Sequence, residues 1–229
     1  MSLEKLTLII PAKNEEESLP LVLDELKKYN VKKIVIIPSD DHKTYNAIEK
    51  YDCKILFQKK NGFGAAIIEG FNNSETYYSC IFNADGSFDP ASLQKMYDLL
   101  EDENNQLDFI FNSRYTGNGG SDDDTIITKI GNFFFTGLCN LLFRTSASDV
   151  LYTYVMGKTK YFLDNNLKCY DFTLCVELVI KAKKNKQNYF FLNSYERSRL
   201  KGIKKVNEFK DGLLILIYMI KQFFVLNIK

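Results

Sequence analysis

Residues 81–90 read IFNADGSFDP, and this stretch decides the fold class. Apolar residues from Tyr77 to Phe82 have the character of a buried strand, which Gly86 and Pro90 bring to an end. In an open α/β sheet, ligands gather beyond the carboxyl ends of the strands. A carboxylate at that position, Asp85, suits a hard divalent cation that also holds phosphate oxygens. The alternative is a strand followed by an Asx turn, because Asn and Asp favour turns.

The start of the chain predicts a βα unit. An apolar strand over residues 6–10 stops at Pro11, and leucines at helical spacing follow from residue 19. Between them lie Asn14 and Glu15, which could hold a ribose hydroxyl or a base edge together with helix amides. The alternative is that acids in the first helical turn only cap the helix.

Two further segments continue the α/β pattern. A second strand over residues 33–37 leads into an acidic loop that contains Asp40 and Asp41. Residues 60–70, KNGFGAAIIEG, then open a helix in which Gly64 allows close approach of a backbone or a flat ligand. This segment lacks the full Gly-x-Gly-x-x-Gly dinucleotide fingerprint.

The second half of the chain concentrates positive charge. Arg114 follows a predicted strand over residues 109–111, where its guanidinium could grip two phosphate oxygens. The alternative is a surface arginine paired with the acids at 122–124. Residues 181–210 carry a net charge of +8, whereas the whole chain carries only +1. Such a run is usually a solvated face, but it would also suit an anionic acceptor or membrane.

Taken in order, these segments resemble the family 2 inverting glycosyltransferases with a GT-A fold, and most closely the dolichol-phosphate mannose synthase branch. The resemblance runs from Leu6 to about Leu214. It implies that the donor is a nucleoside-diphosphate sugar, with UDP or GDP as the nucleotide. The donor would bind with Mg²⁺ or Mn²⁺ at an Asp-x-Asp position, in which asparagine here replaces the first aspartate. The implied metal ligands are Asp85, Asn83 and Ser87. The implied nucleotide-sugar residues are Pro11, Asn14, Glu15, Asp40 or Asp41, Gly64, Asn83, Ala84 and Asp85.

The same resemblance assigns the acceptor side. Arg199 and Lys205 match an Arg-x-x-Gly-x-Ser-Lys element in which Lys204 replaces the serine, and Arg114 would join them on the acceptor. Asp149 would lie near the reacting sugar, so Asp149, Arg114 and Asp85 are the candidate catalytic residues. A hydroxyl acceptor would need Asp149 as a base, whereas a phosphate acceptor would need none. Glu177 is expected to be structural.

The expected reaction is inverting sugar transfer to a polyprenyl phosphate or a lipid-linked glycan. The alternatives are transfer to a soluble saccharide hydroxyl in surface polysaccharide synthesis, and a non-catalytic member that binds nucleotide sugars. A sugar-nucleotide nucleotidyltransferase is disfavoured because residues 11–15 are acidic and contain no glycine. Nucleic acid is not an expected partner, because the net charge is close to zero and no stacking motif accompanies the basic stretch.

Length and composition predict one α/β domain over residues 1–229, with a mostly parallel sheet flanked by helices. Residues 1–113 would form the nucleotide-sugar half, and residues 114–229 the acceptor half with a C-terminal amphipathic helix. Five scattered cysteines and one histidine give no zinc spacing, and they indicate reduced thiols in the cytoplasm. The first residues show no signal peptide.

Two apolar segments bear on membranes. Residues 131–143 are apolar and aromatic, and residues 212–228 form a seventeen-residue segment interrupted by polar side chains. A spanning helix needs about 20 apolar residues. We therefore expect an interfacial helix on the inner face of the plasma membrane, a helix packed in a homodimer, or a core helix.

Overall fold

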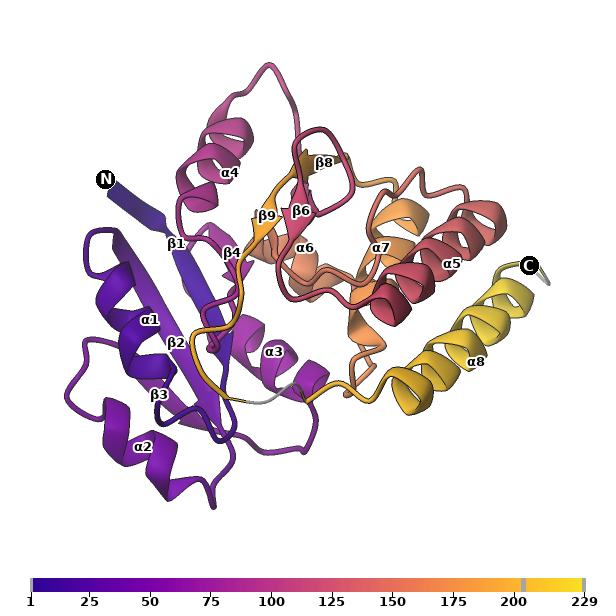
Figure 1. The fold of residues 1–229 in the computed structure, drawn as a ribbon. Coiled ribbons are helices and arrows are strands. Elements are labelled where there is room, and N and C mark those ends of the chain that lie inside the picture. Colours follow the sequence, from indigo (N-terminus) through magenta and orange to yellow (C-terminus); the bar gives the residue numbers. More distant parts are fainter. Residues whose placement is uncertain (1, 203–204, 228–229) are drawn as a thin grey trace.

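The computed structural model describes residues 2–202 and 205–227, and it is built around one twisted sheet (Figure 1). The seven strands are parallel except β7, which runs antiparallel to both of its neighbours. A short pair of parallel strands, β6 (Gly120–Ser121) and β9 (Tyr195–Glu196), lies apart from this sheet. The order across the main sheet is β3 (Lys54–Phe57), β2 (Asn30–Ile37), β1 (Ser2–Pro11), β4 (Tyr78–Ile81), β7 (Val155–Lys158), β5 (Phe109–Ser113) and β8 (Tyr189–Asn193).

Helices cover both faces of the sheet, and each face has its own hydrophobic core. The first face carries α1 (Leu19–Leu26), α2 (His42–Ile48) and α4 (Ser92–Glu101). The second face carries α3 (Phe63–Asn72), α5 (Ile126–Phe143), α6 (Thr159–Asp164), α7 (Leu174–Lys184) and α8 (Glu208–Asn227).

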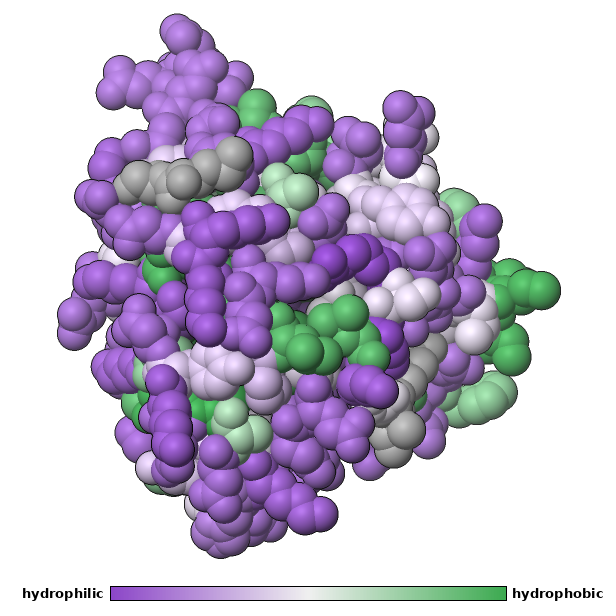
Figure 2. Space-filling model, turned by 60° about the vertical axis from the view of Figure 1, so that its left-hand side comes forward, coloured by the Kyte–Doolittle hydropathy of each residue, from purple (hydrophilic) through white to green (hydrophobic). Residues whose placement is uncertain are grey.

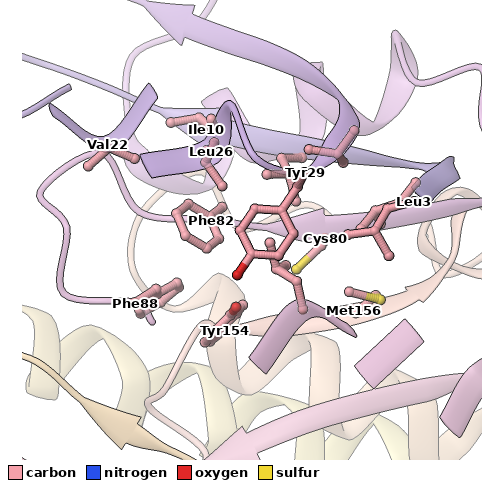
Figure 3. Packing of buried hydrophobic residues seen from close by; sticks show 14 of the residues in the cluster. Leu3, Ile10, Val22, Leu26, Tyr29, Cys80, Phe82, Phe88, Tyr154 and Met156 are labelled. Carbon is pink, nitrogen blue, oxygen red and sulfur yellow. The ribbon is translucent and has the colours of Figure 1, made fainter. Parts of the chain in front are cut away.

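Strand β1 shows why the sequence folds into these layers. Leu8 and Ile10 point into the first core, whereas Ile9 between them points into the second. Successive side chains of a strand face opposite sides, so a continuous apolar run is required when both faces are covered. In the first core, the Tyr154 ring stacks on Phe88 at 4.5 Å and meets Phe82 edge-on at 5.6 Å (Figure 3).

The predicted α/β class and mostly parallel sheet are confirmed. The antiparallel β7 was not predicted. It inserts between β4 and β5, so the main sheet draws strands from both expected halves of the chain. The predicted C-terminal helix is present, but it begins earlier, at Glu208. Ile228, the last residue predicted for it, lies outside the described residues.

Candidate functional site

The carboxyl ends of β1, β2, β4 and β5 lie at one edge of the sheet, because these strands are parallel to one another. The segments that follow these four strands carry most of the predicted site residues. Asn14 and Glu15 follow β1, Asp41 follows β2, Asp85 follows β4 and Arg114 follows β5. This common edge is the candidate site.

After β4 the chain turns tightly around Asp85. Its Oδ1 accepts hydrogen bonds from the backbone N–H of Ser87 at 3.0 Å and from the Ser87 hydroxyl at 2.8 Å. Asn83 Nδ2 donates to the same hydroxyl at 3.2 Å, so the three predicted ligand residues are in contact with one another. The Asx turn that the sequence offered as one alternative is therefore present, and the cation site stays a prediction.

The loops after β1 and β2 are tied to each other. Asp41 Oδ2 accepts from the Asn14 backbone N–H at 2.6 Å, and Asp41 also caps helix α2 through Thr44. Burial alone would raise the pKa of Asp41, but these hydrogen bonds outweigh it and lower the pKa. Asp41 is thus engaged in holding the loop that contains Asn14, which has a positive φ of 52°. Asp40, the preceding residue in the chain, is exposed.

Gly64 allows the close approach of another protein segment. It is buried in the first turn of α3, against the loop over residues 169–171. A Cβ at this position would lie 2.3 Å from the carbonyl oxygen of Cys169 and 2.7 Å from that of Asp171. The missing side chain therefore lets two protein segments approach each other, which is one of the two predicted alternatives, and a contact of Gly64 with the nucleotide stays a prediction.

Arg114 lies at the centre of a buried ion cluster. Its Nε and Nη2 donate to the two carboxylate oxygens of Asp149 at 2.8 and 3.1 Å. Its Nη1 donates to Asp124 at 3.2 Å and to Glu196 at 3.1 Å, and Tyr152 lies against the guanidinium. Burial alone would lower the pKa of Arg114, but the three carboxylates raise it well above its ordinary value.

This pairing bears on the roles predicted for two residues. Arg114 was expected to grip an acceptor phosphate, but four of its hydrogen bonds go to protein carboxylates. The alternative pairing with the acids at 122–124 is seen at Asp124, in a buried rather than a surface setting. Asp149 is fully buried, and Arg114 donates to both of its carboxylate oxygens, so in this arrangement Asp149 positions Arg114; its predicted catalytic role stays a prediction.

The cluster continues through Arg199. Its Nε and Nη2 donate to Asp123 at 3.1 and 2.6 Å, and its Nη1 lies 3.8 Å from Asp85 Oδ2. The five linked acids, Asp85, Asp123, Asp124, Asp149 and Glu196, outnumber Arg114 and Arg199 by three. Burial raises the pKa of Glu196, and Arg114 opposes this only in part. The site is therefore short of positive charge.

Residues 197–202 and 205, which we call the crossing segment, lie between β9 and α8 in the chain and pass the strand ends (Figure 1). Arg197 donates to the carbonyl oxygens of Gly86 and Phe88. Lys205 Nζ donates to the Glu15 carboxylate and to the Lys13 carbonyl oxygen. The predicted acceptor cations Arg199 and Lys205 thus contact predicted donor-side residues. Lys204 lies outside the described residues.

Two further residues illustrate what sequence reasoning reached and missed. The Glu177 carboxylate accepts from the backbone N–H groups of Lys168 and Cys169, as suits a structural residue. The sequence analysis missed Glu196, because this residue lies in a two-residue strand and belongs to no recognisable motif. Among the described residues, no three His, Cys, Asp or Glu side chains come together as a metal site.

The chain matches the family model for glycosyl transferase family 2 over residues 7–164, more than half of its length. That range contains the segments after β1, β2, β4 and β5, and it ends before the crossing segment.

Similar proteins include UDP-N-acetylglucosamine–dolichyl-phosphate N-acetylglucosaminyltransferase of Methanococcus voltae. It is 26% identical over 207 residues, which cover 79% of this chain and 81% of that protein. An uncharacterized glycosyltransferase of Mycobacterium tuberculosis is 27% identical over 101 residues. That match covers 44% of this chain and 46% of the length of the relative.

Among solved structures, glucosyl-3-phosphoglycerate synthase of Mycobacterium tuberculosis, in complex with Mn²⁺, UDP and phosphoglyceric acid, superposes with a TM-score of 0.73. The superposition covers 95% of this chain and 78% of that one at 12% sequence identity, so it bears on the fold alone. The fold, the strand-end motifs and the family match agree, and the chain belongs to glycosyl transferase family 2.

Proposed function

We propose that this protein transfers a sugar, with inversion, from a UDP-sugar to a polyprenyl phosphate, and that it depends on a divalent cation. The observation that carries the acceptor assignment is the engagement of both Asp149 oxygens by Arg114. The carboxylate predicted as a base is thus occupied, and a phosphate acceptor needs no base because it is already an anion. The similarity to a UDP-N-acetylglucosamine–dolichyl-phosphate transferase over most of both chains supports the same donor and acceptor classes.

The residues around Asp85 fit a divalent cation that a diphosphate also holds. They offer one carboxylate, the Ser87 hydroxyl and the Asn83 amide, which are hard oxygen donors for Mg²⁺ or Mn²⁺. The excess of three acids in the surrounding cluster favours a divalent cation. When bound, that ion would stabilise the negative charge that develops on the leaving UDP.

The chain's own residues would do the positioning. Asp40 would read the base, and the loop of Asn14 and Glu15 would hold the nucleoside. The acceptor phosphate oxygen forms the bond to C1 of the sugar from the face opposite UDP. The C1–O bond to UDP breaks, and its electron pair leaves with the diphosphate, so the anomeric configuration inverts.

The crossing segment would change its contacts during this cycle. Arg199 now binds Asp123 and lies 3.8 Å from Asp85, and Lys205 binds Glu15; Asp85 and Glu15 lie on the donor side. Binding of cation and donor at Asp85 and Glu15 would displace the contacts of Arg199 with Asp85 and of Lys205 with Glu15, while the hydrogen bonds of Arg199 to Asp123 would remain.

Radiolabel transfer tests this proposal. Labelled UDP-N-acetylglucosamine, UDP-glucose and GDP-mannose are each offered with Mn²⁺ to polyprenyl phosphate in detergent, beside a soluble saccharide. We expect label in the lipid phase from a UDP-sugar, and none with Asp85→Ala. Label only in the soluble product would overturn the lipid-phosphate acceptor. No transfer and no donor hydrolysis with any donor would favour a binding protein instead.

The role of Asp149 has its own test. Asp149→Asn keeps one oxygen for Arg114 but removes the carboxylate. We expect a loss in kcat well below the ~10²–10⁴-fold that a general base supplies. A larger loss, with a pH profile that loses its acidic limb, would show that Asp149 acts as a base and that the acceptor is a hydroxyl.

A further inference from the structure

Helix α5 exposes an unusually apolar outer side for a surface helix. Its inner side places Cys139 in the second core and also holds two polar side chains: Asn132 Oδ1 accepts from the Leu151 backbone N–H, and Thr136 Oγ1 accepts from that of Val150. A helix on the surface of a globular protein normally turns its polar side toward water. The outward stripe of α5 consists instead of large apolar side chains, 54–79% exposed: Ile126, Ile127, Ile130, Phe133, Phe134 and Leu141.

Helix α8 extends this apolar surface. It packs beside α5, where Gly212 faces the Phe135 ring (Figure 1). Ile215 and Met219 face the core, whereas Phe209 is 85% exposed on the outer side. The remaining exposed apolar residues of α8 are Leu213, Ile217, Ile220, Phe224 and Val225. We call the outward stripes of α5 and α8 together the apolar face. The view in Figure 2 is mainly hydrophilic, with hydrophobic patches near its centre and at its right-hand margin.

The charges beside the apolar face are mostly positive. Lys129 is exposed on α5, and the exposed Arg144 caps the end of that helix. Lys210 and Lys221 are exposed on α8. Helix α5 contains no acid, and the two acids of α8 lie in its first turn. Lysine and arginine side chains have an apolar stem and a cationic end, so they suit the boundary between the acyl chains and the anionic headgroups of a membrane.

The apolar face reaches the candidate site. The Phe133 ring lies 5.0 Å from the ring of Tyr115, and the Tyr115 hydroxyl donates to Asp124 in the Arg114 cluster. A lipid chain that lies along α5 could therefore reach the border of the candidate site.

We propose that the apolar face docks onto the surface of an anionic phospholipid bilayer. This inference deepens the proposed function, because it brings the site to the layer in which a polyprenyl phosphate resides. A second copy of the chain is a poorer occupant, since in a two-fold dimer the same patch meets itself and the flanking cations would face each other.

The helices lie in the interface and do not span the bilayer. By length and composition, α5 is the one described helix that could cross a membrane, and 17% of it is buried. Its 18 residues extend about 27 Å, short of the ~30 Å hydrocarbon core. Insertion would also break the hydrogen bonds of Asn132 and Thr136 and of Asn140, whose side chain bonds Ala147.

Vesicle co-sedimentation with the intact chain, without donor or acceptor, tests the docking. Vesicles of phosphatidylcholine alone are compared with vesicles that contain phosphatidylglycerol. We expect binding that is stronger on the anionic vesicles and weakens with salt. The variant Ile130→Ser with Leu141→Ser should bind at least about tenfold more weakly, because burial of one large apolar side chain is worth roughly that factor.

Matched controls keep the result interpretable. Leu21→Ser with Phe57→Ser removes two similarly exposed apolar side chains from α1 and β3 and should bind as the intact chain does. Lys129→Glu with Lys221→Glu should remove the preference for anionic vesicles. Circular dichroism verifies that each variant is folded. The proposal is overturned if the intact chain does not bind vesicles, if the control variant loses as much binding, or if light scattering shows a dimer that the α5 variant dissociates. Transfer to a soluble saccharide would refute the acceptor assignment and leave the vesicle result unaffected.

Discussion

Replacing Arg114 by methionine should destabilise the protein more than the loss of any surface ion pair. Methionine keeps much of the side-chain length and removes the charge. The carboxylates of Asp149, Asp124 and Glu196 would then stay close together without their shared cation. Their side chains are only 0%, 11% and 10% exposed, so water can replace the guanidinium only poorly.

The magnitude follows from this burial. Removing one partner of a buried ion pair typically costs about 3–5 kcal/mol, since the remaining charge is left uncompensated. A domain of ordinary stability unfolds at about 5–15 kcal/mol. We therefore expect Arg114→Met to remove a large part of the free energy of unfolding.

Urea unfolding, followed by circular dichroism at pH 7, measures this loss. The control is Lys5→Met, which breaks an exposed pair with Glu101 and should leave the free energy of unfolding within error of the parent. Adding Glu196→Gln to Arg114→Met should recover part of the loss, because one unpaired charge is removed. A loss below about 1 kcal/mol, or further destabilisation by the second change, would refute the charge argument.

Three other changes probe the site and its support. Burial raises the pKa of Glu196 in the folded protein above 4.5, so the parent loses free energy of unfolding as the pH rises and Glu196 ionises. The free energy of unfolding of Glu196→Gln, measured in urea, should therefore increase relative to that of the parent between pH 4.5 and 7. Parallel pH profiles of the two proteins would contradict this. Gly64→Ala should lower the free energy of unfolding by about 1–3 kcal/mol, because its Cβ would collide with a neighbouring backbone. Gly137→Ala is the control and should not lower it, because the space around Gly137 is open. Equal changes in melting temperature for the two variants would refute the packing role of Gly64. Asn83→Asp should tighten Mn²⁺ binding measured calorimetrically with UDP present, and unchanged affinity would place Asn83 outside the ion's ligands.

The strand-end motifs could be predicted because their information is local. A strand that ends at Ile81 and a turn at Gly86 put Asp85 at the sheet edge whatever the rest of the chain does. The same holds for Asn14 and Glu15 after β1. Sequence reasoning therefore located this edge, and the parallel order of the sheet brought its members together.

The partners of Arg114 could not be predicted, because they depend on contacts between distant segments. Glu196 lies 82 residues further along the chain, and Asp149 lies 35 residues away. The antiparallel insertion of β7 has the same origin, since pairing between distant strands leaves no local pattern. At Gly64 the sequence predicted the close approach of a backbone or a flat ligand, and only the structure shows that the backbone of residues 169–171 lies there.

Helix α5 shows why composition alone could not separate a core helix from a membrane-facing one. The sequence shows an apolar segment with scattered polar residues, which is compatible with either. In the structure, Asn132 and Thr136 face inward and bond the backbone of residues 150–151, while the outward stripe of α5 is apolar. Phe133 contacts Tyr115, and Tyr115 bonds Asp124, so this stripe connects to the ion cluster. Docking of the apolar face as proposed would therefore place the candidate site beside the lipid layer.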